Sequence, residues 1–164
     1  NMDDAIVRIT ETALKMQGFS TLRFNFRGTG FSAGKHDNGI GEVDDLMSIY
    51  DWVVGTYKPE QVIVAGYSFG SIIAAQAASQ IKSNLVLLLA PPTRGIQLDF
   101  LVGSKVIAIV GSKDDFVDDE ILVELAAKLS SMTVTVVEGA DHFFTGEQAN
   151  LFTIIESELK AHVL

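Results

Sequence analysis

Stretches rich in apolar residues recur along the chain and are separated by polar, glycine-containing segments. The most apolar of them are short and almost uninterrupted, as in residues 85–89, Leu-Val-Leu-Leu-Leu. Such runs are typical of parallel strands, which are covered on both faces of their sheet. Five stretches are predicted to be strands: residues 21–26, 61–65, 85–89, 106–110 and 134–137.

Between these runs, apolar residues recur at the three- and four-residue spacing of an amphipathic helix. Helices are predicted over residues 3–17, from about 42 to 54, after residue 70, from 118 or 119 to about 129, and over 148–163. Gly18 is placed to end the first helix, and residues 93–103 form an irregular link. The alternation predicts an α/β fold with a mainly parallel sheet flanked by helices. We interpret the 164 residues as a single domain.

Composition and net charge argue against several classes of protein. No apolar run approaches the roughly 20 residues that span a bilayer, and the first residues lack the pattern of a signal peptide. A formal net charge of −9 argues against binding to nucleic acid, because phosphates would be repelled. The chain has no cysteine, hence neither disulfides nor thiolate metal ligands, which fits a cytoplasmic protein. The oligomeric state stays open.

The most informative motif joins the predicted strand at 61–65 to a helix. Residues 66–70 read Gly-Tyr-Ser-Phe-Gly, which matches the pattern G-x-S-x-G, and small residues follow at 71–75. A serine on so tight a turn has its hydroxyl exposed above the sheet, and both glycines are expected where side chains would collide. The motif therefore indicates Ser68 as a nucleophile.

A nucleophilic serine needs a base, and the base needs an acid that orients it. Asp114 follows the strand predicted at 106–110, and His142 follows the strand predicted at 134–137. Like Ser68, both lie just beyond the carboxyl end of a parallel strand, and these ends meet at one edge of the sheet. The three side chains are therefore predicted to converge.

With these motifs the sequence resembles the α/β-hydrolase family, specifically its small, lidless, bacterial-type members. The resemblance covers nearly the whole chain and rests on residues 23–32, 37–42, 66–70, 89–92, 111–114 and 139–144. It implies a fold of the α/β-hydrolase type, with Ser68 as nucleophile, His142 as general base and Asp114 as acid. It also implies that the backbone N–H of Phe69 binds the oxyanion of the tetrahedral intermediate.

The family's first strands and its other oxyanion loop lie ahead of the position that corresponds to Asn1. A helix over residues 3–17 also reads as a right-handed crossover from an earlier strand. We therefore expect an upstream segment of some tens of residues. It would place a strand between those at 21–26 and 61–65 and supply the second oxyanion donor.

Two other aspartates compete with Asp114 as the acid. Asp115 is its neighbour, but adjacent side chains point in different directions, so only one of the two reaches the imidazole. The glycine-x-x-aspartate spacing of the family favours Asp114. Asp141 is next to His142 and is therefore badly placed to orient the ring of its neighbour.

Residues 28–33 match the dinucleotide fingerprint G-x-G-x-x-A, but they do not support nucleotide binding. That fingerprint requires a helix that directs its N-terminus at a pyrophosphate, whereas the turn-rich segment 34–39 follows here. We expect these glycines to shape a tight loop that Arg27 anchors through hydrogen bonds. His36 and Asp37 lack a third ligand, and no metal site is predicted.

Aromatic residues in or beside the site loops are expected to line an apolar acyl pocket unless they belong to the core. They are Phe31, Tyr67, Phe69, Phe116, Phe143 and Phe144. A pocket of this kind favours short-chain or aromatic esters over charged substrates.

The predicted function is hydrolysis of a small ester, thioester or related acyl substrate through an acyl-enzyme on Ser68. No organic cofactor or metal is implied. Two alternatives remain open. One is a non-catalytic binding or regulatory protein on the same scaffold, because a fold does not determine a function. The other is a peptidase that acts on short peptides.

Overall fold

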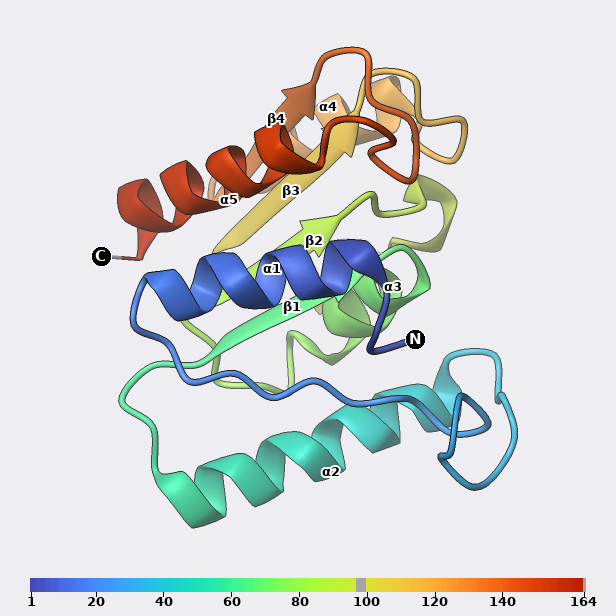
Figure 1. Ribbon diagram of the computed structural model, residues 1–164, viewed down its shortest axis with the longest axis vertical. Coiled ribbons are helices and arrows are strands. Elements are labelled where there is room, and N and C mark those ends of the chain that lie inside the picture. The colour runs from blue at the N-terminus through green and yellow to red at the C-terminus, as the bar shows by residue number, and fades with distance from the viewer. Residues whose placement is uncertain (97–99, 164) are drawn as a thin grey trace.

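The computed structural model describes residues 1–96 and 100–163, which show the predicted alternation of strands and helices (Figure 1). Within these residues one sheet has the strands β1 (Ile63–Tyr67), β2 (Leu85–Leu89), β3 (Val106–Gly111) and β4 (Met132–Val137). The helices are α1 (Ala5–Met16), α2 (Ile40–Tyr57), α3 (Phe69–Ala77), α4 (Asp119–Lys128) and α5 (Gln148–His162). The strands lie in the order β1-β2-β3-β4 and all pairs are parallel, which confirms the predicted fold class.

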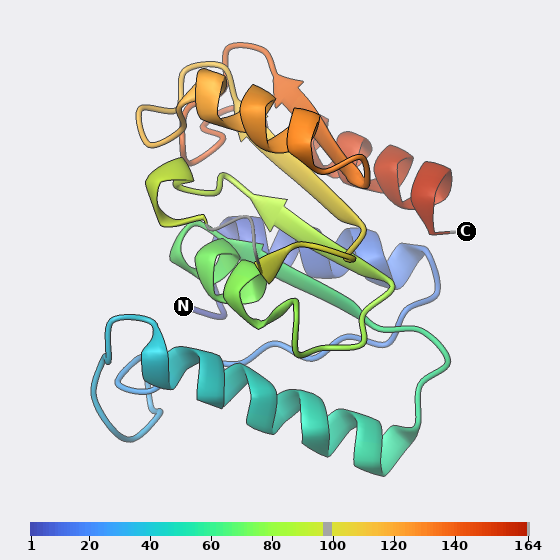
Figure 2. The ribbon, with the colours of Figure 1, turned by 180° about the vertical axis from the view of Figure 1, so that it is seen from behind.

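Helices cover both faces of the sheet, as the two opposite views show (Figures 1 and 2). α1 and α5 lie on one face, and α3 and α4 lie on the other, with α2 packed beside α3. Successive residues of a strand point to opposite faces. Leu87 of β2 therefore packs with the core under α1 and α5, while Leu88 packs with the core under α3 and α4. Burial on both faces explains why β2 and β3 are apolar at every position.

The helix ends follow local sequence signals. Asp4 and Asp118 cap α1 and α4, because their carboxylates accept backbone N–H groups of the first turn. Gly18, with φ at +89°, follows the C-terminal end of α1, where a left-handed residue stops the helix. No helix in the described part of the chain combines the length and the apolarity needed to cross a bilayer.

The prediction of a strand at 21–26 is wrong in one respect. The segment is extended, but none of the described strands lies beside it, so no backbone ladder forms. Side chains position it instead: Arg23 Nε lies 2.7 Å from Glu11 Oε2, and the Met2 N–H donates to Asn25 Oδ1 at 2.7 Å. Alternating apolar and polar residues, as in Thr-Leu-Arg-Phe-Asn-Phe at 21–26, favour a strand, but pairing also requires a neighbour, which local sequence does not specify.

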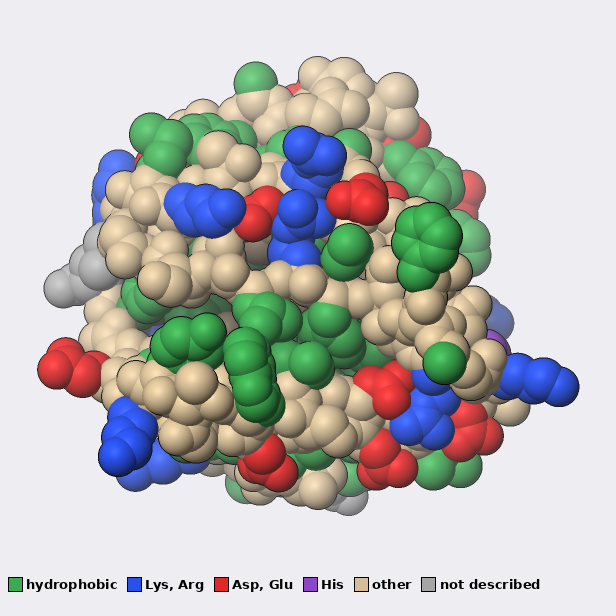
Figure 3. Space-filling model, turned by 60° about the horizontal axis from the view of Figure 1, so that its bottom comes forward, with side chains coloured by type: hydrophobic (Ala, Val, Ile, Leu, Met, Phe, Trp, Pro, Cys, Tyr) green, Lys and Arg blue, Asp and Glu red, His purple; other side chains and the backbone are tan. Residues whose placement is uncertain are grey.

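The side of the molecule that carries this segment and α2 presents a group of apolar side chains at its surface (Figure 3). Leu22 of the extended segment is 45% exposed, and Trp52 and Tyr57 of α2 are half or more exposed. β1 has β2 on one side and no described strand on the other. Among the described strands β1 is therefore an edge strand, as β4 is at the other end of the sheet.

The starts of two strands differ from the prediction, and part of the predicted link at 93–103 lies outside the described residues. β1 begins at Ile63 rather than residue 61; at Val62 the backbone N–H donates to the side chain of Asn84, at 2.9 Å, instead of to a neighbouring strand. β4 begins at Met132, two residues early. In the link predicted at 93–103, Thr93–Gly95 form one 3-10 turn, and residues 97–99 lie outside the described residues.

Candidate active site

The carboxyl ends of β1, β3 and β4 bring three loops to one edge of the sheet (Figure 1). Ser68 comes directly after β1, Asp114 follows β3 by three residues, and His142 follows β4 by five. Parallel pairing places these ends together because every strand points the same way. The residues predicted to converge are thus carried on adjoining loops.

Ser68 occupies a strained turn between β1 and α3. Its φ of 51° and ψ of −120° lie outside the regions that residues other than glycine usually adopt. Strain of this kind costs about 1–3 kcal/mol and persists only where the surroundings enforce it. Here the Ser68 N–H donates to the Leu89 carbonyl of β2 at 2.9 Å, and α3 begins at the next residue. The turn directs the hydroxyl out of the sheet edge.

The two glycines that flank Ser68 are not equivalent. A Cβ added at Gly66 would lie 2.1 Å from the carbonyl oxygen of Gly70, so no side chain fits there. A Cβ at Gly70 would meet nothing within 4 Å. The expectation that both positions exclude side chains is therefore right for Gly66 and wrong for Gly70.

This difference predicts opposite outcomes for two alanine variants. Gly66→Ala should lower the free energy of unfolding by at least about 1–3 kcal/mol, because the backbone must move to admit the methyl group. Gly70→Ala, in the first turn of α3, should stay within about 0.5 kcal/mol of the wild type. Urea unfolding followed by circular dichroism measures both. Equal losses would contradict the steric account.

Ser68, His142 and Asp114 are joined in series. Ser68 Oγ lies 2.8 Å from His142 Nε2, and His142 Nδ1 lies 2.8 Å from Asp114 Oδ2. The Asp114 side chain is fully buried, and its other oxygen accepts the N–H of Phe116 at 2.9 Å. A carboxylate that accepts the Nδ1 proton leaves Nε2 free to accept a proton from the serine hydroxyl.

The competing aspartates lie elsewhere. The side chain of Asp115 is exposed. Asp141 Oδ1 accepts the N–H groups of Thr145, at 2.9 Å, and of Phe143, at 3.0 Å. The hydrogen bonds from Thr145 are the main reason why the pKa of Asp141 is lowered. Asp141 therefore stabilises its own loop, and the contact with His142 Nδ1 is made by Asp114.

Backbone contacts tie the loop of the acid to the loop of the histidine. The Lys113 N–H donates to the Ala140 carbonyl at 2.9 Å, and the Gly139 N–H donates to Ser112 Oγ at 2.8 Å. The approach is so close that a Cβ at Gly111 would lie 2.3 Å from the Ala140 oxygen. These contacts fix the distance between Asp114 and His142, and no local sequence motif indicates them.

Three aromatic rings surround His142. The ring centroids of Phe116, Phe143 and Tyr67 lie 4.7, 5.3 and 5.7 Å from the imidazole. The Tyr67 hydroxyl also donates to the His142 carbonyl at 3.1 Å, and burial raises the pKa of Tyr67 to about 12, so it stays protonated. Phe116 and Phe143 are both more than half exposed. They form an apolar rim beside the imidazole of His142.

Other aromatic residues predicted for the pocket are placed differently. Phe31 is fully exposed and lines a separate hollow with residues of the 21–26 segment and of α2. Phe144 is fully buried and belongs to the core under α1 and α5. Phe69 is the first residue of α3, and its N–H is one of those that have no partner within a helix. The ring of Phe69 is about one-third exposed.

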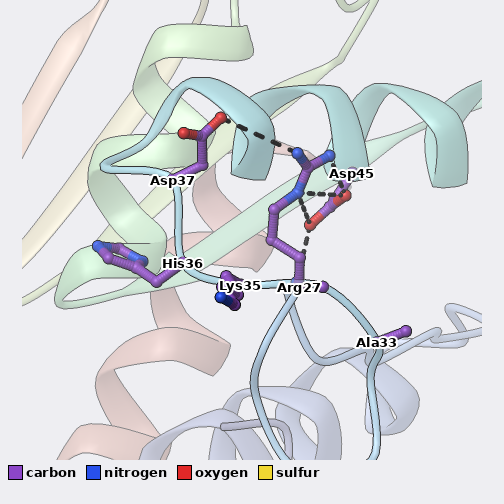
Figure 4. Close-up of a pocket in the computed structure, with 7 residues that line it drawn as sticks. Arg27, Ala33, Lys35, His36, Asp37 and Asp45 are labelled. Carbon is purple, nitrogen blue, oxygen red and sulfur yellow. Dashed lines mark hydrogen bonds and ion pairs between the residues drawn. The ribbon is translucent and has the colours of Figure 1, made fainter.

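The loop between the extended segment and α2 is held by charged groups (Figure 4). Arg27 donates to Asp45 through its backbone N–H, at 2.8 Å, and through Nη2, at 2.7 Å, which confirms that it anchors the loop. Glu42 is fully buried. Burial raises the pKa of its carboxyl, but the N–H groups that donate to it outweigh burial, and the pKa is lowered. Glu42 thus holds the loop through its hydrogen bonds, a role that the sequence motifs did not indicate.

Comparison with known proteins agrees with the fold described above. The sequence model of the alpha/beta hydrolase fold family matches residues 8–99. A structure of an alpha-beta serine hydrolase homologue from Coxiella burnetii is 33% identical, with a TM-score of 0.90, over 97% of this chain and 78% of that one. A serine hydrolase without a lid from Xanthomonas campestris is 27% identical, with a TM-score of 0.90, over 98% of this chain and 75% of that one.

An uncharacterised protein of Rickettsia prowazekii is 32% identical over 157 residues, and the chain spans 66% of that relative's length. The family match covers more than half of this chain, and the Coxiella homologue shares both its fold and a third of its residues. The resemblance predicted from the sequence motifs is confirmed. The chain belongs to the alpha/beta hydrolase fold family.

Proposed function

We propose that this chain is a serine hydrolase in which Ser68 is the nucleophile, His142 the general base and Asp114 the orienting acid. The observation that carries the proposal is the series of two 2.8 Å contacts from Ser68 Oγ through the imidazole to a buried carboxylate. Membership of the hydrolase fold family and the strained conformation of Ser68 support it.

The geometry suits acyl transfer in two steps. Ser68 Oγ attacks the carbonyl carbon of the substrate while its proton passes to His142 Nε2. The tetrahedral intermediate collapses, His142 returns the proton to the leaving alcohol or thiol, and an acyl-enzyme on Ser68 remains. Water then attacks the acyl carbon, with His142 again taking the proton, and the carboxylic acid is released.

The N–H of Phe69 is the proposed donor to the oxyanion of both intermediates. It directly follows the nucleophile and lies at the N-terminal end of α3, where N–H groups point out of the helix and the helix dipole favours negative charge. A donor in a fixed position needs no reorganisation when the charge develops, which lowers the barrier.

The proposed substrate is a small ester or thioester with an apolar acyl group. Phe116 and Phe143 offer exposed aromatic surface within 4.7 and 5.3 Å of the His142 ring, measured between ring centroids. Aromatic surface beside a nucleophile stabilises an apolar group by burial and offers no favourable partner to an anionic one. Short-chain and aromatic esters are therefore the substrates to test first.

Labelling with a fluorophosphonate tests the proposal directly. The reagent phosphonylates a serine that an adjacent base activates, and we expect one adduct, located by peptide mass spectrometry at Ser68. Hydrolysis of p-nitrophenyl acetate should be lost in proportion to labelling. A folded protein that is neither labelled nor active would favour a non-catalytic binding protein on the same scaffold.

A further inference from the structure

Two residues that precede α2, Phe26 and His36, contact the ring of Phe69. Phe26, at the end of the extended segment, contacts it edge to face with ring centroids 6.1 Å apart. His36, on the loop before α2, contacts it with centroids 5.2 Å apart. The residue proposed to bind the oxyanion therefore has its side chain fixed by a part of the chain far from it in sequence.

His36 is itself held in place by a buried carboxylate. Its Nδ1 lies 2.8 Å from Glu42 Oε1, although the imidazole is 59% exposed. Glu42 has no exposed surface and accepts the N–H of Asp37 and the N–H of Gly39, each at 2.8 Å. The second contact is half of a capping box, because Glu42 is the third residue of α2 and Gly39 its N-cap.

The same loop also lies against α3 itself. A Cβ added at Gly39 would be 3.4 Å from Gln76 Oε1 and 3.6 Å from Ile73 Cδ1, so the loop passes close to side chains of the helix that Phe69 begins. Figure 4 shows His36 and Asp37 on this loop beside Arg27, whose guanidinium is fixed by Asp45. The loop is thus anchored by Asp45 at one end and by Glu42 at the other, and at Gly39 it lies close to α3.

We propose that His36, seated by Glu42, is a positioning residue for the oxyanion donor. It acts through the Phe69 ring, which holds the first turn of α3 and hence the Phe69 N–H in the direction of the developing charge. This inference rests on the proposed function of Ser68. Preorganised donors contribute to catalysis only while their direction is maintained, so looser packing of Phe69 lowers kcat and leaves substrate binding intact.

The test compares three variants of the full protein in hydrolysis of p-nitrophenyl acetate. His36→Ala and Glu42→Gln should each lower kcat about tenfold, well short of the ~10²–10³ that follows loss of a donor, with KM within about twofold. The control is His162→Ala. His162 also pairs with a glutamate, Nε2 lying 3.3 Å from Glu158 Oε2, but it sits at the far end of α5. It should leave kcat unchanged.

A double-mutant cycle tests the route of the effect. If His36 acts through the Phe69 ring, His36→Ala should have almost no further effect on kcat once Phe69→Ala has removed that ring. A further tenfold loss in the double variant would overturn the inference. A rise in KM at constant kcat for His36→Ala would do the same, because His36 would then contact the substrate.

The experiment distinguishes a failure to fold, a failure of the proposed function and a failure of this inference. Glu42→Gln removes a buried charge that two N–H groups require; if this variant does not fold, the half-exposed His36 carries the test alone. A wild-type protein that fluorophosphonate fails to label at Ser68 would overturn the proposed function and this inference together. Normal labelling with an unaffected His36→Ala would overturn only the inference.

Discussion

Replacing Ser68 by alanine should lower kcat for p-nitrophenyl acetate by a factor on the order of 10⁶, and it should abolish fluorophosphonate labelling. Without Oγ no acyl-enzyme forms, and His142 Nε2 loses the group that lies 2.8 Å from it. The fold should be unaffected, because the strained turn is held by the Ser68 N–H and by the absence of a side chain at Gly66.

Ser48→Ala provides the matched control for this prediction. Ser48 is exposed on α2, and its hydroxyl only donates to the Asp44 carbonyl one turn earlier. The variant should keep wild-type turnover and full labelling. Labelling that persists in Ser68→Ala, with mass spectrometry locating the adduct on another serine, would show that the nucleophile has been misassigned.

The buried parts of the fold were open to prediction because burial leaves a local signal. Residues 85–89 are apolar at every position, and β2 spans the same five residues. A strand covered on both faces must be apolar throughout, so its length can be read from the chain. Asp118 and Gly18 gave helix ends in the same way, since a cap bonds to or follows the adjacent turn.

Strand pairing and the packing of the loop before α2 left no signal in the local sequence. The segment 21–26 has the composition of a strand, yet whether it joins a sheet depends on a neighbour that its own residues do not determine. The role of Glu42 also depends on residues at a distance, since His36 and the N–H groups it accepts come together only when the loop folds back on the start of α2. Short sequence patterns do not predict contacts that form only when a loop folds.

The candidate site contains features that the sequence predicts and features that it does not. Strand order along the chain predicted that Ser68, Asp114 and His142 lie on loops at one edge, and the structure places them there. The pocket was less predictable, because an aromatic residue near a motif lines a cavity or joins the core according to its direction. Phe116 borders His142, whereas Phe144, two residues after His142, is fully buried.

Replacing Asp114 by asparagine should lower kcat by about 10⁴ while leaving substrate binding nearly intact. The buried carboxylate accepts the Nδ1 proton of His142 at 2.8 Å and thereby leaves Nε2 unprotonated toward Ser68. An asparagine amide that turns its NH₂ group to Nδ1 donates instead, which favours the tautomer with the proton on Nε2. That tautomer cannot take the serine proton. Steady-state kinetics with p-nitrophenyl acetate measure the loss.

Asp115→Asn is the control that separates the acid from its neighbour. Both variants remove one negative charge from the same loop, so any effect of net charge on the site is common to them. Because the side chain of Asp115 is exposed and that of Asp114 is buried against the imidazole, Asp115→Asn should change kcat by less than about twofold. The reverse pattern would move the acid by one residue, and two large losses would mean that the loop, rather than one carboxylate, orients His142.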